Sequence, residues 1–599
     1  MMPGRKSSVE LNTTGSKDSA LSTPRHDLPV SSATQLLANS SGVQNIQEYH
    51  ERLVRRVNEL ENEVRIMKSA HNAVLPICRL PAEILSSIFI LVYPGFHANR
   101  SLPYCFVLSH VCWHWKTVAL GCSAIWADLD HTVRPTLAGL MLRRSRNAPL
   151  TIQYWFPDRR HERLIRTILS QTPRLHQIRI VDSFDGAFDL VEAFSEFGGY
   201  APSLHTLHIQ RDTKMRKDEF PDIFLAGGAP FLRILELCNC NIPWGRMPFS
   251  SCLTVLRLRD EPSNSRNRPS PNGFLGVLRS LTSLKQLELR GYLPEDESQP
   301  LQAPVTLPVL ETFLLQDSIH AIRCFLRSVQ VPHTANPMLY ITDHLDDVLT
   351  VGLLFSDFKS ALKSFDLNSR AQPVSPVVRQ LQFDTDIHDF GNGIMKFMTM
   401  DVWLETGYAP PPKPVKFVGN FLPLADVFLT VREQFDLSRL QELGIEDFSE
   451  LQVTDWTNSF GDLARLHTVK VGTESEVRNL LGAMNKTIPR GSLLAPRSSH
   501  YFPALTYIEL HGMDFNRGEP RANIIACIID NLKQRSKTQP VRQLLVNRCR
   551  NFKHHHHELL DNAEIPGLTL LWDRYEDSDS DSELEEEYAE GSDHDWHTP

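Results

Sequence analysis

A hexamer of the form Leu-x-x-Leu-x-Leu occupies residues 284–289, where the sequence is Leu284-Lys285-Gln286-Leu287-Glu288-Leu289. Further copies, some with isoleucine in place of a leucine, lie at Leu175–Ile180, Leu204–Ile209, Leu232–Leu237, Leu253–Leu258 and Leu310–Leu315. Successive copies begin 29, 28, 21, 31 and 26 residues apart. Apolar residues that alternate with polar ones predict a short strand, and a repeat of this length predicts an array of stacked supersecondary units.

Looser copies of the hexamer follow at Leu362–Leu367, Leu440–Ile445, Leu466–Val471, Leu505–Leu510 and Val541–Val546. Stretches with helical periodicity, such as Phe274–Leu281 and Ala321–Val329, lie between copies. We therefore expect a leucine-rich-repeat-like solenoid over residues 171–570, irregular after 340, with a parallel sheet on its concave side. The alternative is an unrelated α/β domain with several leucine-rich strands. The sequence favours this alternative more for residues 340–560, where the copies are unevenly spaced, than for the regular copies before them.

The residues between the leucines of each hexamer are expected on the concave face, because successive side chains of a strand point to opposite faces. One such position from each of five consecutive copies gives Arg179, His208, Glu236, Arg257 and Glu288. Neighbouring strands lie about 4.8 Å apart, so these side chains would form one row of mixed charge. Such a row would bind an extended client peptide by complementary charge. A solvated sheet face is the alternative.

A heptad pattern covers residues 43–74. The d positions are Ile46, Leu53, Leu60, Met67 and Val74, and the a positions are Val43, His50, Val57, Val64 and His71. β-Branched residues at a favour a two-stranded parallel coiled coil, hence a parallel homodimer. The parallel arrangement would also place opposite charges of the two helices together: Arg56 with Glu61, and Glu63 with Lys68. A single amphipathic helix that packs on its own chain is the alternative.

An apolar segment follows the heptads, with the sequence Leu80-Pro81-Ala82-Glu83-Ile84-Leu85-Ser86-Ser87-Ile88-Phe89. Pro81 stands where a helix can begin. A second amphipathic helix is expected to carry Leu108, Val111, Cys112, Trp115 and Val118. A unit of about 50 residues can hardly bury so much apolar surface alone, so we expect part of it to contact a partner.

These two segments, Leu80-Pro-x-Glu83-Ile84-Leu85-x-x-Ile88-Phe89 and Val111-Cys112-x-x-Trp115, resemble the F-box. The stretch from Leu80 to Trp126, with Ala148-Pro149-Leu150-Thr151-Ile152 after it, is similar to the F-box proteins of mushroom-forming fungi. Members of that family carry a helical heptad segment before the box and an irregular leucine-rich array behind it. This chain departs from the compact F-box between Phe89 and Leu108, where it is longer and richer in proline.

The resemblance implies a substrate-recognition subunit of an SCF-type ubiquitin ligase, whose box binds the adaptor subunit and through it the cullin. The positions that match the motif are Leu80, Pro81, Ile84, Leu85, Ile88, Val111, Cys112 and Trp115. Trp115 and the Leu80-Pro81 corner are the preferred anchors, although Ile88 and Trp115 would alternatively hold the box together. The second hypothesis for function is a non-ligase scaffold that dimerises through residues 43–74 and displays the solenoid.

The net charge of −9 is concentrated at the C-terminal end. Residues 573–595 hold twelve acidic residues against one arginine, a local charge of −11, so the remainder is close to neutral. That balance disfavours nucleic acid as a partner. Three serines in this segment, Ser578, Ser580 and Ser582, have an acidic residue three positions on and are candidates for phosphorylation. An unregulated solvating tail is the alternative.

Sequence features that would indicate catalysis are missing. There is no nucleotide-binding glycine loop, no Gly-x-Ser-x-Gly elbow and no paired Cys–His set at zinc spacing. We therefore expect neither enzyme activity nor a cofactor or metal. Ten cysteines without a dense framework, no secretory leader and no membrane-length apolar run predict a cytoplasmic and/or nuclear protein that does not bind membranes.

The expected fold class is α/β, with an N-terminal coiled-coil helix and an all-α F-box before the solenoid. The expected divisions are a disordered arm (1–42), a coiled-coil helix (43–74), an F-box (77–128), a linker (129–170), the solenoid (171–570) and an acidic disordered tail (571–599).

Overall fold

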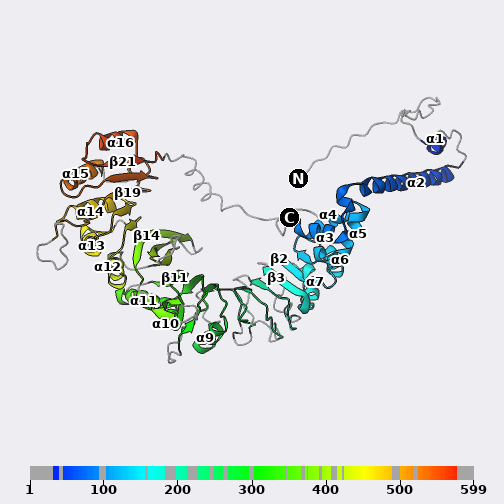
Figure 1. Cartoon of the computed structure of the whole chain (residues 1–599), viewed down its shortest axis with the longest axis horizontal. Coiled ribbons are helices and arrows are strands. Elements are labelled where there is room, and N and C mark those ends of the chain that lie inside the picture. Colours follow the sequence, from blue (N-terminus) through cyan, green and yellow to red (C-terminus); the bar gives the residue numbers. More distant parts are fainter. Residues whose placement is uncertain are drawn as a thin grey trace, which may run out of the picture. The chain divides into compact units, whose positions relative to one another are not determined.

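The fold is described from a computed structural model of the chain (Figure 1). The residues that it describes are 31–38, 45–92, 103–155, 159–181, 194, 197, 199–211, 225, 227–242, 244, 247, 249–260, 268–295, 303–344, 347–365, 371–373, 376–389, 394–405, 414–420, 424–448, 450–488, 500–516 and 524–575. Two compact units are present. Unit 1 comprises Met1–Tyr93 and Tyr104–Gly121, and unit 2 comprises Pro94–Pro103 and Cys122–Pro599.

The longest element of unit 1 is helix α2 (Ile46–Ala73), none of whose side chains is buried. Asn45 caps it by accepting a hydrogen bond from the Glu48 amide. The helix predicted over 43–74 is thus confirmed for residues 46–73. A short helix, α1 (Ser32–Ala38), contacts α2, and Tyr49 donates to the Leu37 carbonyl at 2.9 Å. The expected disordered arm is therefore wrong for the residues of α1, while 1–30 and 39–44 lie outside the described residues.

Four short helices complete the described part of unit 1: η1 (Pro76–Arg79), α3 (Ala82–Leu91), α4 (Tyr104–Ser109) and α5 (Trp113–Gly121). Leu85 and Phe89 of α3 are buried, and the Phe89 ring lies 5.0 Å from that of Trp115. The single helix predicted from Leu108 to Val118 is instead two helices. The helical conformation is interrupted between α4 and α5. The Cys112 sulfur accepts a hydrogen bond from the Trp115 amide at 3.5 Å at the start of α5.

A 17-stranded sheet runs through unit 2. Its spatial order is β1 (Asp128–Asp130), β2 (Leu150–Trp155), β3 (Leu175–Val181), β4 (Thr206–Gln210), β5 (Ile234–Cys238), β6 (Val255–Arg259), β7 (Gln286–Arg290), β9 (Thr312–Asp317), β11 (Asn336–His344), β16 (Val415–Asn420), β15 (Ile394–Leu404), β14 (Val378–Asp389), β17 (Glu442–Ile445), β18 (Thr468–Val471), β19 (Tyr507–His511), β20 (Gln543–Asn547) and β21 (Thr569–Trp572). Pairing is parallel throughout, except that β15 runs antiparallel to β14 and β16.

Helices cover one face of this sheet (Figure 1). They are α6 (Pro135–Arg144), α7 (Arg159–Leu169), α9 (Pro271–Ser280), α10 (Ile319–Ser328), α11 (Val348–Ala361), α12 (Leu424–Gln434), α13 (Val453–Ser459), α14 (Glu474–Met484), α15 (Ile524–Ser536) and α16 (His554–Asp561), with short 3-10 turns η3 (Ser123–Trp126) and η4 (Thr172–Arg174). Phe313 of β9 lies 6.4 Å, ring to ring, from Phe325 of α10. None of the described helices is both long and apolar enough to cross a membrane.

Each of the six regular hexamers ends in a strand of this sheet, β3 to β7 and β9, as the repeat predicts. Four looser copies likewise supply β17 to β20. The copy at Leu362–Leu367 does not, because its described part is strand β12 (Leu362–Phe365) of a separate four-stranded sheet. That sheet also contains β8 (Val305–Thr306), β10 (Val329–Pro332) and β13 (Ala371–Pro373). The chain is thus a mixed α/β protein with a large, mostly parallel sheet.

Two predicted boundaries near the start of unit 2, the end of the F-box and the extent of the linker, are wrong. Trp126, expected inside the F-box, is fully buried in unit 2, and the guanidinium of Arg144 lies 4.5 Å from its ring. The expected linker of 129–170 is instead packed structure that includes β2 and α6, because the apolar side chains of these elements are buried. At the other end, Trp572 belongs to strand β21 rather than to the tail, and residues 576–599 lie outside the described residues.

A buried ion pair connects three loops of unit 2. Asp317, at the end of β9, is fully buried, and Arg268 donates to its two carboxylate oxygens at 2.7 and 2.9 Å. The carboxylate also accepts from the Leu293 and Ser318 amides at 3.2 and 2.9 Å. Arg268 in turn donates to the Leu293 carbonyl at 2.7 Å. One charge pair therefore fixes the segment before α9 against the ends of β7 and β9.

Candidate interaction surfaces

The outer face of helix α3 is an exposed apolar surface. Ile84 and Leu91 lie seven residues apart, on one side of the helix, and keep 50% and 83% of their surface accessible. Pro81, before the helix, and Val111, after α4, are also exposed. Partly buried positions of the predicted motif are Leu80, Ile88, Cys112 and Trp115. The structure thus leaves a share of the predicted adaptor-contact residues open to a partner.

Leu85 is the exception among the motif positions, since its side chain is fully buried. A fully buried side chain cannot touch a partner, so the prediction that Leu85 contacts the adaptor is corrected: the residue belongs to the core of unit 1. Trp115 packs on Phe89, which fits the alternative in which it holds the helices together. Neither position is therefore a first choice for testing contact.

The motif misses several exposed apolar residues of helices α3 to α5, of which Leu91 and Trp113 are the most exposed. Trp113 at the start of α5 keeps 72% of its surface accessible, although the motif selects Trp115 instead. Leu91 was missed because the motif ends at Phe89. The helical period would have found Leu91, since it falls two turns after Ile84 on the same face. Large apolar side chains exposed together on a small unit mark an interaction site.

The second surface lies on the sheet face opposite the helices. Strand register places Arg179 beside His208, His208 beside Glu236, Glu236 beside Arg257, and Arg257 beside Glu288. The predicted row of five side chains is therefore present, and we call it the charged row. Its role in binding a client stays a prediction.

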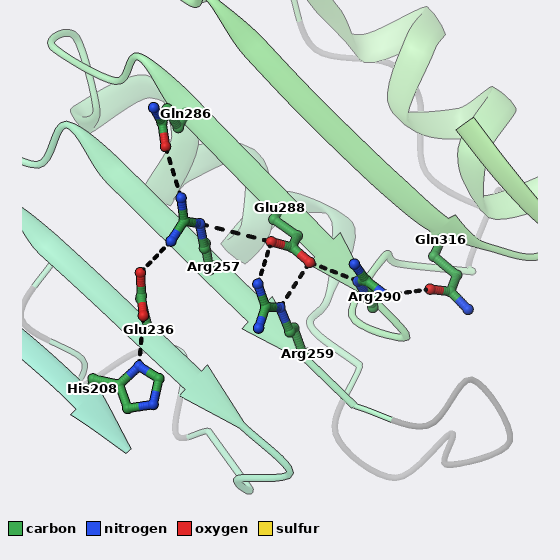
Figure 2. A network of polar contacts seen from close by, with 8 residues as sticks. All are labelled: His208, Glu236, Arg257, Arg259, Gln286, Glu288, Arg290 and Gln316. Carbon is green, nitrogen blue, oxygen red and sulfur yellow. Dashed lines mark hydrogen bonds and ion pairs between the residues drawn. The ribbon is translucent and has the colours of Figure 1, made fainter. Parts of the chain in front are cut away.

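The middle of the charged row is joined by hydrogen bonds (Figure 2). His208 Nδ1 and Glu236 Oε2 lie 2.5 Å apart, and Arg257 Nη1 donates to the other oxygen of Glu236 at 2.5 Å. Arg257 also donates to Gln286 at 2.9 Å. The hydrogen bond from His208, with help from the charges of His208 and Arg257, holds the pKa of Glu236 down at about 2 despite its burial. Glu236 is therefore ionised at neutral pH.

Glu288 is surrounded by three arginines (Figure 2). Arg259 donates to both of its oxygens at 2.7 and 2.8 Å, Arg290 donates at 2.6 Å, and Arg257 Nε lies 3.7 Å away. Burial raises the pKa of Glu288, but these hydrogen bonds and positive charges outweigh it and leave the pKa below its usual value. The sequence prediction missed Arg259 and Arg290, which lie two residues beyond the row on the same sheet face. The period of two would have found them.

An acid-sensitive stability is expected from Glu236. Its folded-state pKa lies below the ordinary 4.5, so the unfolded chain binds the proton more readily and stability is lost as pH falls from 4.5 towards 2. Glu236→Gln should lower the free energy of unfolding at pH 7 by about 2 kcal/mol, less than the full pKa shift implies, because solvent screens this partly exposed group and its partners. Urea unfolding at pH 7, 4.5 and 3 measures it, and the difference from the unchanged protein should shrink with acid. A difference independent of pH would contradict the assignment.

The charged row ends at Glu288, because the register places Leu314 and then Met338 at the next positions, and a second group of charged side chains lies at the other end of the sheet. There the register places Lys470 beside Glu509, and Lys470 pairs with Glu446 at 2.7 Å. A pocket of about 410 Å³ opens at the carboxyl ends of these strands. Its charged and titratable lining residues are Asp384, Glu446, Asp447, Glu474, His511, Asp514 and Arg550. This end of the sheet is therefore acidic, whereas the part around Glu288 is rich in arginine.

No group of three or more His, Cys, Asp or Glu side chains is placed to hold a metal ion within the described ranges. A scan against protein-family models matches none of them, and a search of curated proteins gives no significant match.

Proposed function

We propose that this chain is the substrate-recognition subunit of an SCF-type ubiquitin ligase, acting in the cytoplasm and/or nucleus by binding rather than by catalysis. In this proposal the helices of unit 1 form an F-box, and the outer face of α3 contacts the adaptor that leads to the cullin. The observation that carries it is the exposure of Ile84 and other motif residues on a small helical unit. Unit 2 would be a leucine-rich-repeat-like solenoid that binds the client through the charged row.

The runner-up function is a non-ligase scaffold that dimerises through α2. This helix of 28 residues buries none of its side chains, as expected of a helix that lacks its partner. One predicted interchain pair needs revision, because Arg56 is already bonded to Glu59 at 2.9 Å and to Thr34 and Ser31 of its own chain. Dimer formation would have to rely on the a and d residues instead.

Affinity purification of the full chain followed by mass spectrometry tests the proposal. We expect adaptor and cullin peptides, and a purification that contains neither would favour the scaffold. The same purification with Arg179→Glu and Arg257→Glu should keep the adaptor and change the set of clients, because the sign of the charged row is altered at two places. An identical client set would place client recognition elsewhere.

A further inference from the structure

The charged row, taken together with Arg259 and Arg290 beside it, carries an excess of positive charge. Arg257, Arg259 and Arg290 surround Glu288, and only one further carboxylate, Glu236, bonds to this group among the described residues. We call these three residues the arginine cluster. Adding the exposed Arg179 gives four guanidinium groups against two carboxylates. The excess stands out because the chain as a whole carries a net charge of −9.

The arginine cluster keeps donors available to a second anion. The side chains of Arg259 and Arg290 are 42% and 38% exposed, although both are bonded to Glu288. Each guanidinium has five N–H groups, and the contacts of Arg259 to Glu288 use only its Nε and one terminal nitrogen. Arginines held in place in this way can receive another carboxylate or phosphate at little entropic cost.

The chain itself contains a matching anion. Residues 576–595 include eleven acidic residues and neither lysine nor arginine. Elsewhere the chain is nearly neutral, so this segment is the strongest concentration of charge opposite to the arginine cluster. The acidic pocket near β17 to β19 would repel it and disfavour binding at the nearer end of the sheet.

The segment is long enough to reach the cluster. Ten strand-to-strand steps separate β21 from β7, which is about 48 Å along the sheet. The straight-line distance between these two strands is no longer than this distance along the sheet. About 15 extended residues beyond Tyr575 span this distance. The segment is therefore long enough for acidic residues from Glu590 onwards, among them Asp593 and Asp595, to be placed at the arginines around Glu288.

We propose that the acidic C-terminal segment, residues 576–595, binds the arginine cluster of its own chain through its last carboxylates, Glu590, Asp593 and Asp595, and competes there with acidic client segments. The competition with clients rests on the proposed function, whereas the contact between segment and cluster does not.

A fluorescein-labelled synthetic peptide of residues 576–595 tests the proposal by fluorescence anisotropy. The proteins are the full chain and a full-length variant whose eleven acidic residues at 576–595 are changed to Asn or Gln. The neutral variant should bind the peptide at least about 10-fold more tightly than the unchanged chain, whose own segment competes at high effective concentration. Salt should weaken the binding, because the contacts are between exposed charges.

Two further variants are made in the neutral background. Arg259→Gln with Arg290→Gln should weaken peptide binding about 10-fold, since two charge-assisted contacts are lost. Arg143→Gln with Arg163→Gln removes the same charge from exposed positions on α6 and α7 and should leave binding unchanged. Thermal unfolding of each variant confirms that it is folded.

Three results would each overturn the proposal. The first is that the cluster variant binds the peptide as tightly as the neutral chain does. The second is that the unchanged and neutral chains bind the peptide equally, and the third is that the neutral chain does not bind it. Adaptor co-purification is unaffected in every case, so failure here is distinct from failure of the ligase assignment.

Discussion

Ile84→Asp combined with Leu91→Asp is expected to lower adaptor binding by about 100-fold or more while unit 1 stays folded. Both side chains are exposed on the outer face of α3, so an aspartate there creates no buried charge. Apolar residues at the centre of an interface contribute about 2 kcal/mol each, and a charge in their place would also have to be desolvated. Binding of the full chain to purified adaptor, measured by calorimetry, gives the ratio directly.

The matched control is Val54→Asp with Ile66→Asp. Both residues are exposed on α2, and neither occupies an a or d position of the heptads. This variant has the same change in charge and apolar surface and should bind the adaptor normally. If both variants bind as the unchanged chain does, the outer face of α3 is not the adaptor site and the scaffold hypothesis gains.

Asp317→Ala is expected to lower the free energy of unfolding of unit 2 by about 3–5 kcal/mol. The carboxylate is fully buried and balances the charge of Arg268. Without it, the only carboxylate left beside Arg268 among the described residues would be that of Glu295, which is half exposed and lies 3.0 Å away. The Leu293 and Ser318 amides would lose their acceptor at the same time. Urea unfolding followed by circular dichroism measures the loss.

An exposed pair provides the comparison. Lys285 and Glu311 lie 2.7 Å apart, but both side chains are more than half exposed. Exposed ion pairs contribute about 0–1 kcal/mol, so Glu311→Ala should change stability by no more than that. If Asp317→Ala costs as little as Glu311→Ala, the buried pair does not hold the three loops as described.

The charged row could be predicted from sequence because it depends on two local rules. Side chains alternate along a strand, and equivalent positions of successive repeats become neighbours in a parallel sheet. His208 and Glu236 follow from these rules alone, and the structure pairs them. Arg259 follows from the same rules and was missed only because one position per repeat was considered.

Other features depend on contacts that no local pattern contains. The motif of unit 1 gives no indication that Leu85 is buried while Ile84, its neighbour in sequence, is half exposed, because burial is decided by which helices pack on α3. The antiparallel strand β15 had a visible signal, since Met398, Met400, Val402 and Leu404 alternate and are buried. Its insertion between β14 and β16 could not be predicted, because pairing order is set by tertiary contacts rather than by period.

That insertion has a consequence for the protein during its synthesis. Most strands of the sheet are covered by the next strand to be made, but β11 pairs on its far side with β16, which begins about 70 residues later. At about 5–20 residues per second, the edge of β11 waits roughly 4–14 s on the ribosome before its partner emerges. An unpaired parallel edge of that kind is open to wrong pairing with another nascent chain. Among the described strands, β11 is therefore the one whose edge stays unpaired for the longest stretch of synthesis before its partner strand emerges.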